Sequence, residues 1–494
     1  MSTISSPRLF KDTILYAITG IATKLIGALL LPILTRLVTP SEYGAIDIIV
    51  LGGLLIFECV LLGTDFMVAL YYHDQAINPR RLIGTLVALR LGMGSIAALL
   101  LVLVAPWLQH WGLPSATQSS ITAIRVAALT LPASGLVSLW IMLMRQQGRS
   151  GWLLLLTFMR VVCTGGLTVS LLWHATDPIS AYFWAIFWVD IAFALLLTTL
   201  FRSQIGRIQK SLAKQLILKG SAFLPRSIYF VLMALITRQI LLHFSSPDSA
   251  ADAVGQYAMA TKISFIVWIL INSSSYAWLS YSLSISHQPE APRIYSKYLL
   301  NYLSVMGLMV VGVALFAADI LRILTTSAYV VAAPAVGWQT LSLLAAGSVV
   351  IVSTGLNITK DTAIIGRTTM LAGLVNIGLA MILIPIGGML GAAIAAAIDQ
   401  GLAVFFLYRA SQKRYPLPFA STEIVGWIGF IISLVSIASL LPTESTIELF
   451  LVKVTLIMLY TIILIKRGHT QFIFELLHRF KRSKYPQSSQ PSEI

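Results

Sequence analysis

Long apolar runs fill this chain of 494 residues, and they constrain its fold more than any other feature. A helix of about 20 apolar residues spans the roughly 30 Å hydrocarbon core of a bilayer. Fourteen runs of this length use roughly 310 residues, which leaves no extramembrane stretch of useful size. The sequence therefore predicts an all-α, polytopic membrane protein. We expect fourteen transmembrane helices at 13–38, 46–71, 82–107, 122–144, 151–173, 179–201, 220–244, 255–285, 298–324, 332–358, 363–386, 388–409, 422–441 and 447–465.

Basic residues divide the connections between these helices into two kinds. The connections after odd-numbered helices, such as 108–121, 174–178, 245–254 and 325–331, contain neither Lys nor Arg. Those after even-numbered helices contain Arg80, Arg81, Arg145, Arg149, Arg202, Arg207, Lys210, Lys214, Lys219, Arg293, Lys297, Lys360, Arg409, Lys413 and Arg414. Loops rich in Lys and Arg stay on the cytoplasmic side of a membrane. With an even number of helices, both termini are expected in the cytoplasm.

The composition excludes several other classes of protein. Only 11% of the residues are charged, against about 25% in soluble domains. The net charge of +15 lies mostly in loops that flank the membrane, so it indicates orientation and not a nucleic-acid partner. Cys59 and Cys163 fall inside apolar runs and are expected to be free thiols. The first run is too long for the core of a cleavable signal peptide.

The longest basic connection divides the chain into two similar halves. We expect an N-terminal six-helix lobe at 1–201, a C-terminal six-helix lobe at 220–409, an extra helix pair at 422–465 and a basic cytoplasmic tail at 466–494. The connection at 202–219 is either a plain cytoplasmic loop or an amphipathic surface helix, with Ile205, Ile208, Leu212 and Leu216 on one face. An internal repeat of two bundles predicts a site between them near the midplane.

Two stretches resemble a known family. LPILTRLVTPSEYG (31–44) looks like the first external turn of bacterial polysaccharide and O-antigen-type oligosaccharide flippases. NIGLAMILIPIGGMLGAAIAAAI (376–398) resembles their helix 11, external turn and helix 12. These flippases belong to the multidrug/oligosaccharidyl-lipid/polysaccharide exporter superfamily.

The resemblance implies two six-helix lobes in a V shape around a central cavity, in the bacterial cytoplasmic (inner) membrane. It implies that a polyprenyl-diphosphate-linked oligosaccharide, a repeat unit of lipopolysaccharide or exopolysaccharide, moves to the outer leaflet by alternating access. The expected partners are this lipid-linked cargo, the lipid bilayer, and a polysaccharide polymerase with its chain-length proteins.

Charged residues inside the predicted helices indicate where function is concentrated, because each costs about 2.5–3.5 kcal/mol near a helix centre. The basic set is Lys24, Arg90, Arg160, Arg226, Arg238 and Lys262, and the acidic set is Glu58, Asp65, Asp190 and Asp399. In one interpretation, Glu58 and Asp65 form structural ion pairs with Lys24, Arg90 or Arg160. In the other, the basic set lines a cationic cavity for a diphosphate or acidic sugars.

Arg226, Arg238 and Lys262 are the strongest candidates for this cavity, because the helices at 220–244 and 255–285 offer no intramembrane acid to neutralise them. Lys262, Ser273 and Tyr276 share one helical face, and with Asn272 they are expected to line the cavity. Asp47, Glu58 and Asp65 form a stripe along the helix at 46–71. Glu58 and Asp65 are candidate coupling groups for H⁺ or Na⁺.

We find no HExxH, nucleotide-binding loop or GxSxG motif, and we expect neither a cofactor nor enzymatic activity. The leading function is an ion-gradient-coupled flippase. Alternatives within the superfamily are a peptidoglycan-precursor flippase and a drug/cation antiporter. A membrane-embedded polysaccharide polymerase and a scaffold for glycan assembly are the remaining alternatives.

Overall fold

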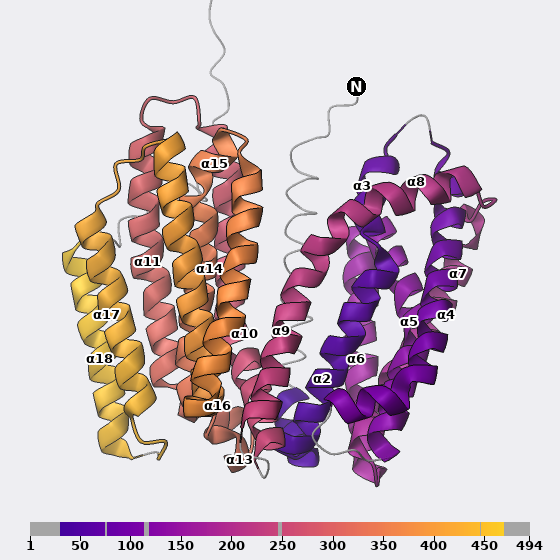
Figure 1. Ribbon diagram of the computed structural model, residues 1–494, viewed down its shortest axis with the longest axis horizontal. Coiled ribbons are helices and arrows are strands. Elements are labelled where there is room, and N and C mark those ends of the chain that lie inside the picture. Colours follow the sequence, from indigo (N-terminus) through magenta and orange to yellow (C-terminus); the bar gives the residue numbers. More distant parts are fainter. Residues whose placement is uncertain (1–29, 75–76, 113–117, 246–248, 445, 469–494) are drawn as a thin grey trace, which may run out of the picture. The chain divides into compact units, whose positions relative to one another are not determined.

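The computed structural model describes residues 30–74, 77–112, 118–245, 249–444 and 446–468. All regular structure in these ranges is helical. Twelve helices are long and apolar enough to cross a membrane. They are α2 (Pro40–Leu61), α4 (Pro79–Gly112), α5 (Gln118–Gln146), α6 (Ser150–His174), α7 (Pro178–Leu200), α9 (Leu224–Phe244), α10 (Ala250–Ser284), α11 (Ala291–Leu315), α14 (Ala333–Val352), α16 (Thr362–Arg414), α17 (Ser421–Leu440) and α18 (Ile447–Lys466). Figure 1 shows their order along the chain.

The long helix α16 is a hairpin of two helices. Gly388 has φ 53° and ψ −131°, which is outside the helical region. A Cβ atom on Gly391 would lie 2.0 Å from the carbonyl oxygen of Leu383, so the chain doubles back closely at this turn. The two arms match the predicted helices 363–386 and 388–409. Most of the predicted helix 13–38 lies outside the described residues, so the total of fourteen stays a prediction.

The predicted helix at 46–71 is broken. It ends at Leu61, and Leu62 (φ 45°) and Gly63 (φ 63°) separate it from α3 (Thr64–Tyr71). A Cβ on Gly63 would lie 2.3 Å from the carbonyl oxygen of Gly220, so this close approach admits only glycine. The stripe predicted from one continuous helix therefore does not extend to Asp65.

Two other predicted helices also end early. Phe316 separates α11 from α12 (Ala317–Leu324), and Ser353 separates α14 from α15 (Thr354–Ile358). A one-turn helix, α13 (Ser327–Val330), precedes α14. Tyr329 in α13 donates a hydrogen bond to the carbonyl of Val38, at 3.2 Å. Burial raises the pKa of Tyr329, so its hydroxyl is a neutral donor at physiological pH.

The chain forms two compact units. The N-terminal unit comprises the described residues up to Met259 together with 321–330 and 377–392. Trp140 lies in the core of this unit and is 1% exposed. Its ring stacks on Phe201, and its indole nitrogen donates a hydrogen bond to Thr198 at 3.1 Å. Unlike the predicted lobe 1–201, this unit includes α9, because α9 packs along α2.

The basic connection contains the amphipathic helix that one interpretation predicted. η1 (Arg202–Gln204) is followed by α8 (Lys210–Gly220) and η2 (Ser221–Phe223). Leu212 and Leu216 insert into the N-terminal core, whereas Lys210 and Lys214 are exposed. Ile208 precedes the helix and is 63% exposed, so it does not share the buried face. Figure 1 shows α8 crossing the end of this unit beside α3.

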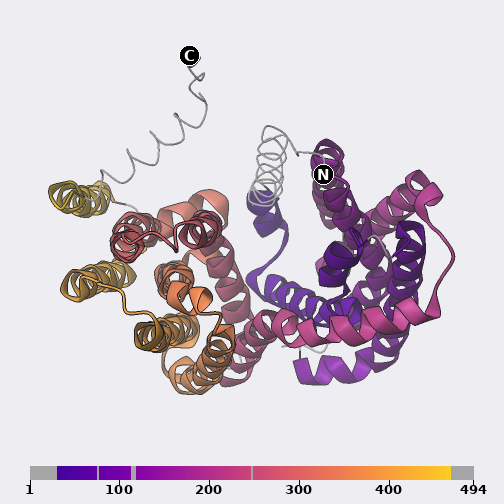
Figure 2. The ribbon, with the colours of Figure 1, turned by 90° about the horizontal axis from the view of Figure 1, so that it is seen from above.

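The C-terminal unit comprises 260–320, 331–376 and the described residues from Ala393 onward. Trp278 stacks on Tyr298 with ring centroids 3.8 Å apart and donates a hydrogen bond to Thr354 at 2.9 Å. The extra helices α17 and α18 pack against α11 at one side of this unit (Figure 2). Lys453 of α18 is buried and lies 2.5 Å from the Asp319 carboxylate of α12.

Candidate functional site

The N-terminal unit contains a cavity between membrane-spanning helices whose lining is mostly apolar and includes six polar residues. Its volume is about 490 Å³. It is lined by Ile49, Val50, Gly53, Leu54, Phe57, Asp65, Ala127, Thr130, Leu131, Ser134, Ser138, Ile141, Met142, Arg145, Arg160, Phe183 and Ile186. The wall thus combines two arginines, one aspartate and three hydroxyl groups with apolar side chains. A cavity of this kind suits a ligand with an anionic, hydroxyl-rich head.

Arg160 is fixed on the wall of this cavity by a buried acid. Its Nε lies 2.8 Å and its Nη2 2.7 Å from Oδ1 of Asp190. The Ser134 hydroxyl donates a hydrogen bond to the other carboxylate oxygen. Asp190 is 1% exposed and Arg160 is 32% exposed, so the acid anchors the base and the guanidinium faces accessible space. Arg160 thus lines a cavity within the N-terminal unit, and its predicted role in binding cargo between the lobes stays a prediction.

Helix α5 supplies most of the other polar lining. Thr130, Ser134, Ser138 and Arg145 recur at intervals of four, four and seven residues. At about 100° per residue they fall within roughly 80° of helical surface. Arg145 was predicted only as one of the basic residues that keep a connection on the cytoplasmic side of the membrane. The same face analysis, applied to the helix predicted at 122–144, would have found the three hydroxyl groups.

Asp65 and Arg90 form the structural ion pair that one interpretation predicted. The Arg90 guanidinium donates a hydrogen bond from Nη2 to Asp65. Arg90 is 1% exposed, so it is not an open cavity residue. Its Nε and Nη1 have no hydrogen-bond partner among the described residues. Glu58 interacts electrostatically with both groups and with the side chain of Ser227.

The expectation that nothing neutralises Arg238 is wrong. Its Nε lies 3.0 Å from Oδ2 of Asp47, and its guanidinium lies 4.9 Å from the ring centroid of Tyr257. The acid comes from α2, a helix that pairs with α9 only in the folded protein. Arg238 is therefore buried in a structural cluster, and any contact with cargo stays a prediction.

Other predicted site residues lie elsewhere. Lys262 and Ser273 are exposed on α10, and Asn272 is half-buried. The Ser273 hydroxyl donates a hydrogen bond to its own helix, at Ile269. Lys24 and the side chains of Arg226 and Tyr276 lie outside what the structure describes. Their predicted role in a cavity between lobes stays a prediction.

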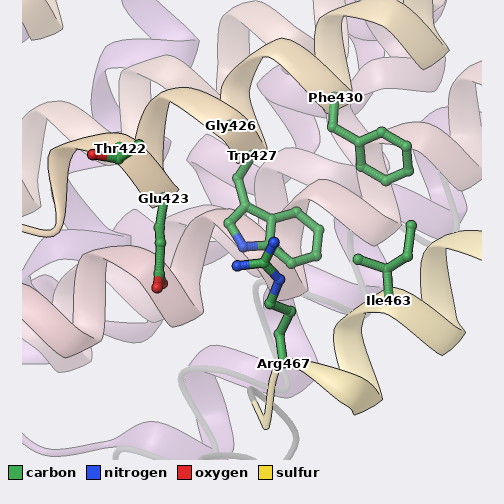
Figure 3. Close-up of a pocket in the computed structure, with 7 residues that line it drawn as sticks. All are labelled: Thr422, Glu423, Gly426, Trp427, Phe430, Ile463 and Arg467. Carbon is green, nitrogen blue, oxygen red and sulfur yellow. The ribbon is translucent and has the colours of Figure 1, made fainter.

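A second pocket lies on the extra helix pair. It has a volume of about 290 Å³ and is lined by Thr422, Glu423, Gly426, Trp427, Phe430, Ile463 and Arg467. Figure 3 shows the Glu423 carboxylate and the Arg467 guanidinium toward one end and the side chains of Phe430 and Ile463 toward the other. One acid and one base balance each other here, unlike the lining of the N-terminal cavity.

The comparison with protein families decides the family. A model described as "Polysaccharide biosynthesis protein" matches residues 9–280, more than half of the chain. The chain belongs to the polysaccharide biosynthesis protein family. The comparison with curated proteins gave no significant match.

Solved structures of transporters share the fold. The lipid II flippase MurJ in an inward closed conformation aligns with TM-score 0.65 and 14% identity, covering 93% of this chain and 100% of its own. An inward-facing multidrug resistance MATE transporter of the MOP superfamily gives TM-score 0.64 and 13% identity over 83% of this chain and 98% of its own. The multidrug transporter DinF-BH gives 0.60 and 15%, over 84% and 96%.

The predicted resemblance to polysaccharide flippases is supported by the family match, and these transporter structures share the fold of the chain. The protein is a multi-pass membrane protein with the fold of these transporters. The structural neighbours named above are a flippase and multidrug transporters, and no enzyme is among them.

Proposed function

We propose that this protein flips a polyprenyl-diphosphate-linked oligosaccharide from the cytoplasmic to the outer leaflet of the bacterial inner membrane by alternating access. The observation that carries the proposal is the cavity of the N-terminal unit, with Arg145 and Arg160 on its wall. Membership of the polysaccharide biosynthesis protein family supports the same cargo. We further propose that an ion gradient drives the cycle.

Arg160 is the residue we propose to contact the diphosphate. Asp190 occupies Nε and Nη2 of its guanidinium, while Nη1 makes no hydrogen bond to the described residues. The side chain is therefore held in position before cargo arrives, so that little side-chain entropy is lost on binding. Charge-assisted hydrogen bonds to phosphate are about twice as strong as neutral ones. A cation in a cleft also lowers the barrier to moving an anion across a low-dielectric layer.

The remaining lining suits a sugar. Hydroxyl groups of Thr130, Ser134 and Ser138 can exchange hydrogen bonds with sugar hydroxyls. The volume of about 490 Å³ falls within the usual range of ligand pockets. It is adequate for a diphosphate and the sugar next to it, while the polyprenyl chain stays in the lipid.

Ion coupling is proposed for Glu58 and not for Asp65. Asp65 is paired with Arg90, and we assign it a structural role because its loss would leave the buried Arg90 without a countercharge. No ion pair involves Glu58 in the part of the chain that the structure describes. A Glu58→Gln variant that still responds fully to H⁺ and Na⁺ gradients would remove Glu58 from the mechanism.

The cargo can be identified in cells. Deletion of the gene, followed by mass spectrometry of extracted lipids, is expected to reveal an accumulated polyprenyl-diphosphate-linked oligosaccharide. The wild-type gene should clear it, Arg160→Ala should not, and Arg125→Ala should clear it as a matched control. Arg125 is an exposed arginine on α5 that does not line the cavity. Accumulation of lipid II, or loss of drug resistance without any lipid intermediate, would contradict the proposed cargo.

A further inference from the structure

Asp399, on the second arm of α16, is a buried acid whose charge nothing nearby balances. It is 5% exposed. Oδ2 accepts a hydrogen bond from Nε2 of Gln400 at 3.0 Å, and Oδ1 has no hydrogen-bond partner among the described residues. The intramembrane acids Asp47, Asp65 and Asp190, by contrast, each pair with an arginine.

The neighbouring elements supply polar groups but no countercharge. On the first arm of α16, the side chain of Asn376 is 9% exposed and interacts with this carboxylate. Helix α14 packs here through a hydrogen bond from Ser342 to the carbonyl of Ala396, at 3.1 Å. No residue of α14 is titratable, since its sequence is APAVGWQTLSLLAAGSVVIV.

The charged residues of these elements lie far along their helices. Arg409 is ten residues from Asp399, which is about 15 Å along a helix. Arg367 is nine residues from Asn376, or about 13 Å. Helix α10 contacts α14 through Ser264, and its basic residue Lys262 is not among the groups that act on Asp399.

The position of Asp399 along its helix places it near the middle of the membrane. Asn376 and Asp399 are twelve and eleven residues from the hairpin turn at Gly388. That distance is about 16–18 Å along each arm, close to the middle of a hydrocarbon core of roughly 30 Å. An isolated carboxylate at this depth is costly, and such groups become neutral instead of staying ionised.

We propose that the carboxyl group of Asp399 is a proton-binding site of the C-terminal unit, which takes up a proton in this conformation as the pH falls below neutral. It gives up its proton when water reaches it during the transport cycle. This second step rests on the proposed function, whereas the protonation itself does not. Gln400 and Asn376 orient the carboxyl group and leave room for its proton on the unpartnered Oδ1.

Infrared spectroscopy of the purified protein tests the protonation directly. The protein is labelled with ¹³C-aspartate so that bands from Glu58 do not interfere. At mildly acidic pH we expect an isotope-shifted C=O stretching band of a protonated carboxyl group, which Asp399→Asn removes. The control is Asp361→Asn, because Asp361 pairs with Arg414 at 2.9 Å. That variant should lose a carboxylate band instead. A wild-type spectrum without a protonated aspartate band overturns the proposal even if Asp399→Asn does not fold.

Coupling is tested separately in proteoliposomes that contain a lipid-linked oligosaccharide. Asp399→Asn should flip this cargo at a rate that an imposed proton gradient raises less than it does for the wild-type protein, because Glu58 is retained. A full response to the gradient would reject the release step while leaving the infrared result intact. Absence of flipping by the wild-type protein would instead count against the proposed function.

Discussion

Asp190 holds Arg160 through two nitrogen atoms, with Oδ1 at 2.8 Å from Nε and 2.7 Å from Nη2. The two residues belong to α7 and α6, and Ser134 of α5 donates a hydrogen bond to the same carboxylate. Three helices thus meet at one buried acid beside the cavity. The position of Arg160 therefore depends on Asp190, which is not part of the cavity wall, and on Ser134, which is.

The first prediction concerns this anchor. Asp190→Asn keeps the side-chain shape but removes the charge that holds Arg160. We expect glycan export to fall about ten- to a hundred-fold, equivalent to roughly 1.5–3 kcal/mol for a charged hydrogen bond. Ser134→Ala should lower it less, since a neutral hydrogen bond contributes about 0.5–1.5 kcal/mol. Export is measured per unit of membrane-inserted protein. Wild-type export by Asp190→Asn at equal abundance would show that the anchor is dispensable.

The second prediction concerns Lys453, which is 3% exposed and pairs with Asp319. Lys453→Met removes the basic partner of Asp319. We expect the free energy of unfolding of the purified protein to fall by about 3–5 kcal/mol. Adding Asp319→Asn should restore part of that loss, because no unpaired charge remains. The exposed pair Arg414–Asp361 is the control, and its loss should cost less than about 1 kcal/mol. Equal effects from the two pairs would contradict the assignment.

The third prediction concerns the contact between α2 and the start of α10. A Cβ on Gly255 would lie 1.8 Å from the carbonyl oxygen of Pro40. Relieving this clash requires a shift of the backbone, which disrupts the packing of the two helices. Gly255→Ala should therefore sharply reduce the abundance of folded protein, as measured by fluorescence-detected size-exclusion chromatography. Gly92→Ala is the matched control, because a Cβ there would meet nothing within 4 Å. A normal elution profile for Gly255→Ala would exclude this packing.

The fourth prediction concerns orientation. In a background without Cys59 and Cys163, cysteines at exposed positions Lys210 and Lys413 should react with impermeant thiol reagents only from the cytoplasm. A cysteine at the exposed position Thr176 should react only from outside. The reason is the confinement of Lys and Arg to alternate connections. Labelling of position 210 in intact cells would reverse or exclude the predicted topology.

The apolar runs and the basic residues between them predicted most of the fold, because a bilayer sets the length and polarity of each helix. The exceptions are local backbone events. The break at Leu62 and Gly63 depends on a close approach to Gly220, which is distant in the sequence. The splits at Phe316 and Ser353 carry no charge or proline that would mark them.

The candidate site was predicted less well, because ion pairing depends on how the helices pack, and consecutive helices supply only some of the pairs. The sequence placed Arg90, Asp65, Arg160 and Asp190 inside the membrane but did not determine which acid pairs with which base. The expectation that Arg238 has no countercharge considered acids only on its own helix and the next one. Its partner Asp47 lies 191 residues away in the sequence. Lys453 was missed, although a single charge inside the apolar run at 447–465 is itself the signal.

Translocation in a purified system tests the central claim most directly. The protein is reconstituted with a fluorescent polyprenyl-diphosphate-linked oligosaccharide, and the fraction reaching the opposite leaflet is measured with a membrane-impermeant quencher. We predict rapid flipping by wild type and Arg125→Ala, and a rate about ten- to a hundred-fold lower for Arg160→Ala, with Arg160→Lys between them. Equal flipping by all four proteins, or no flipping by wild type under any ion gradient, would contradict the account.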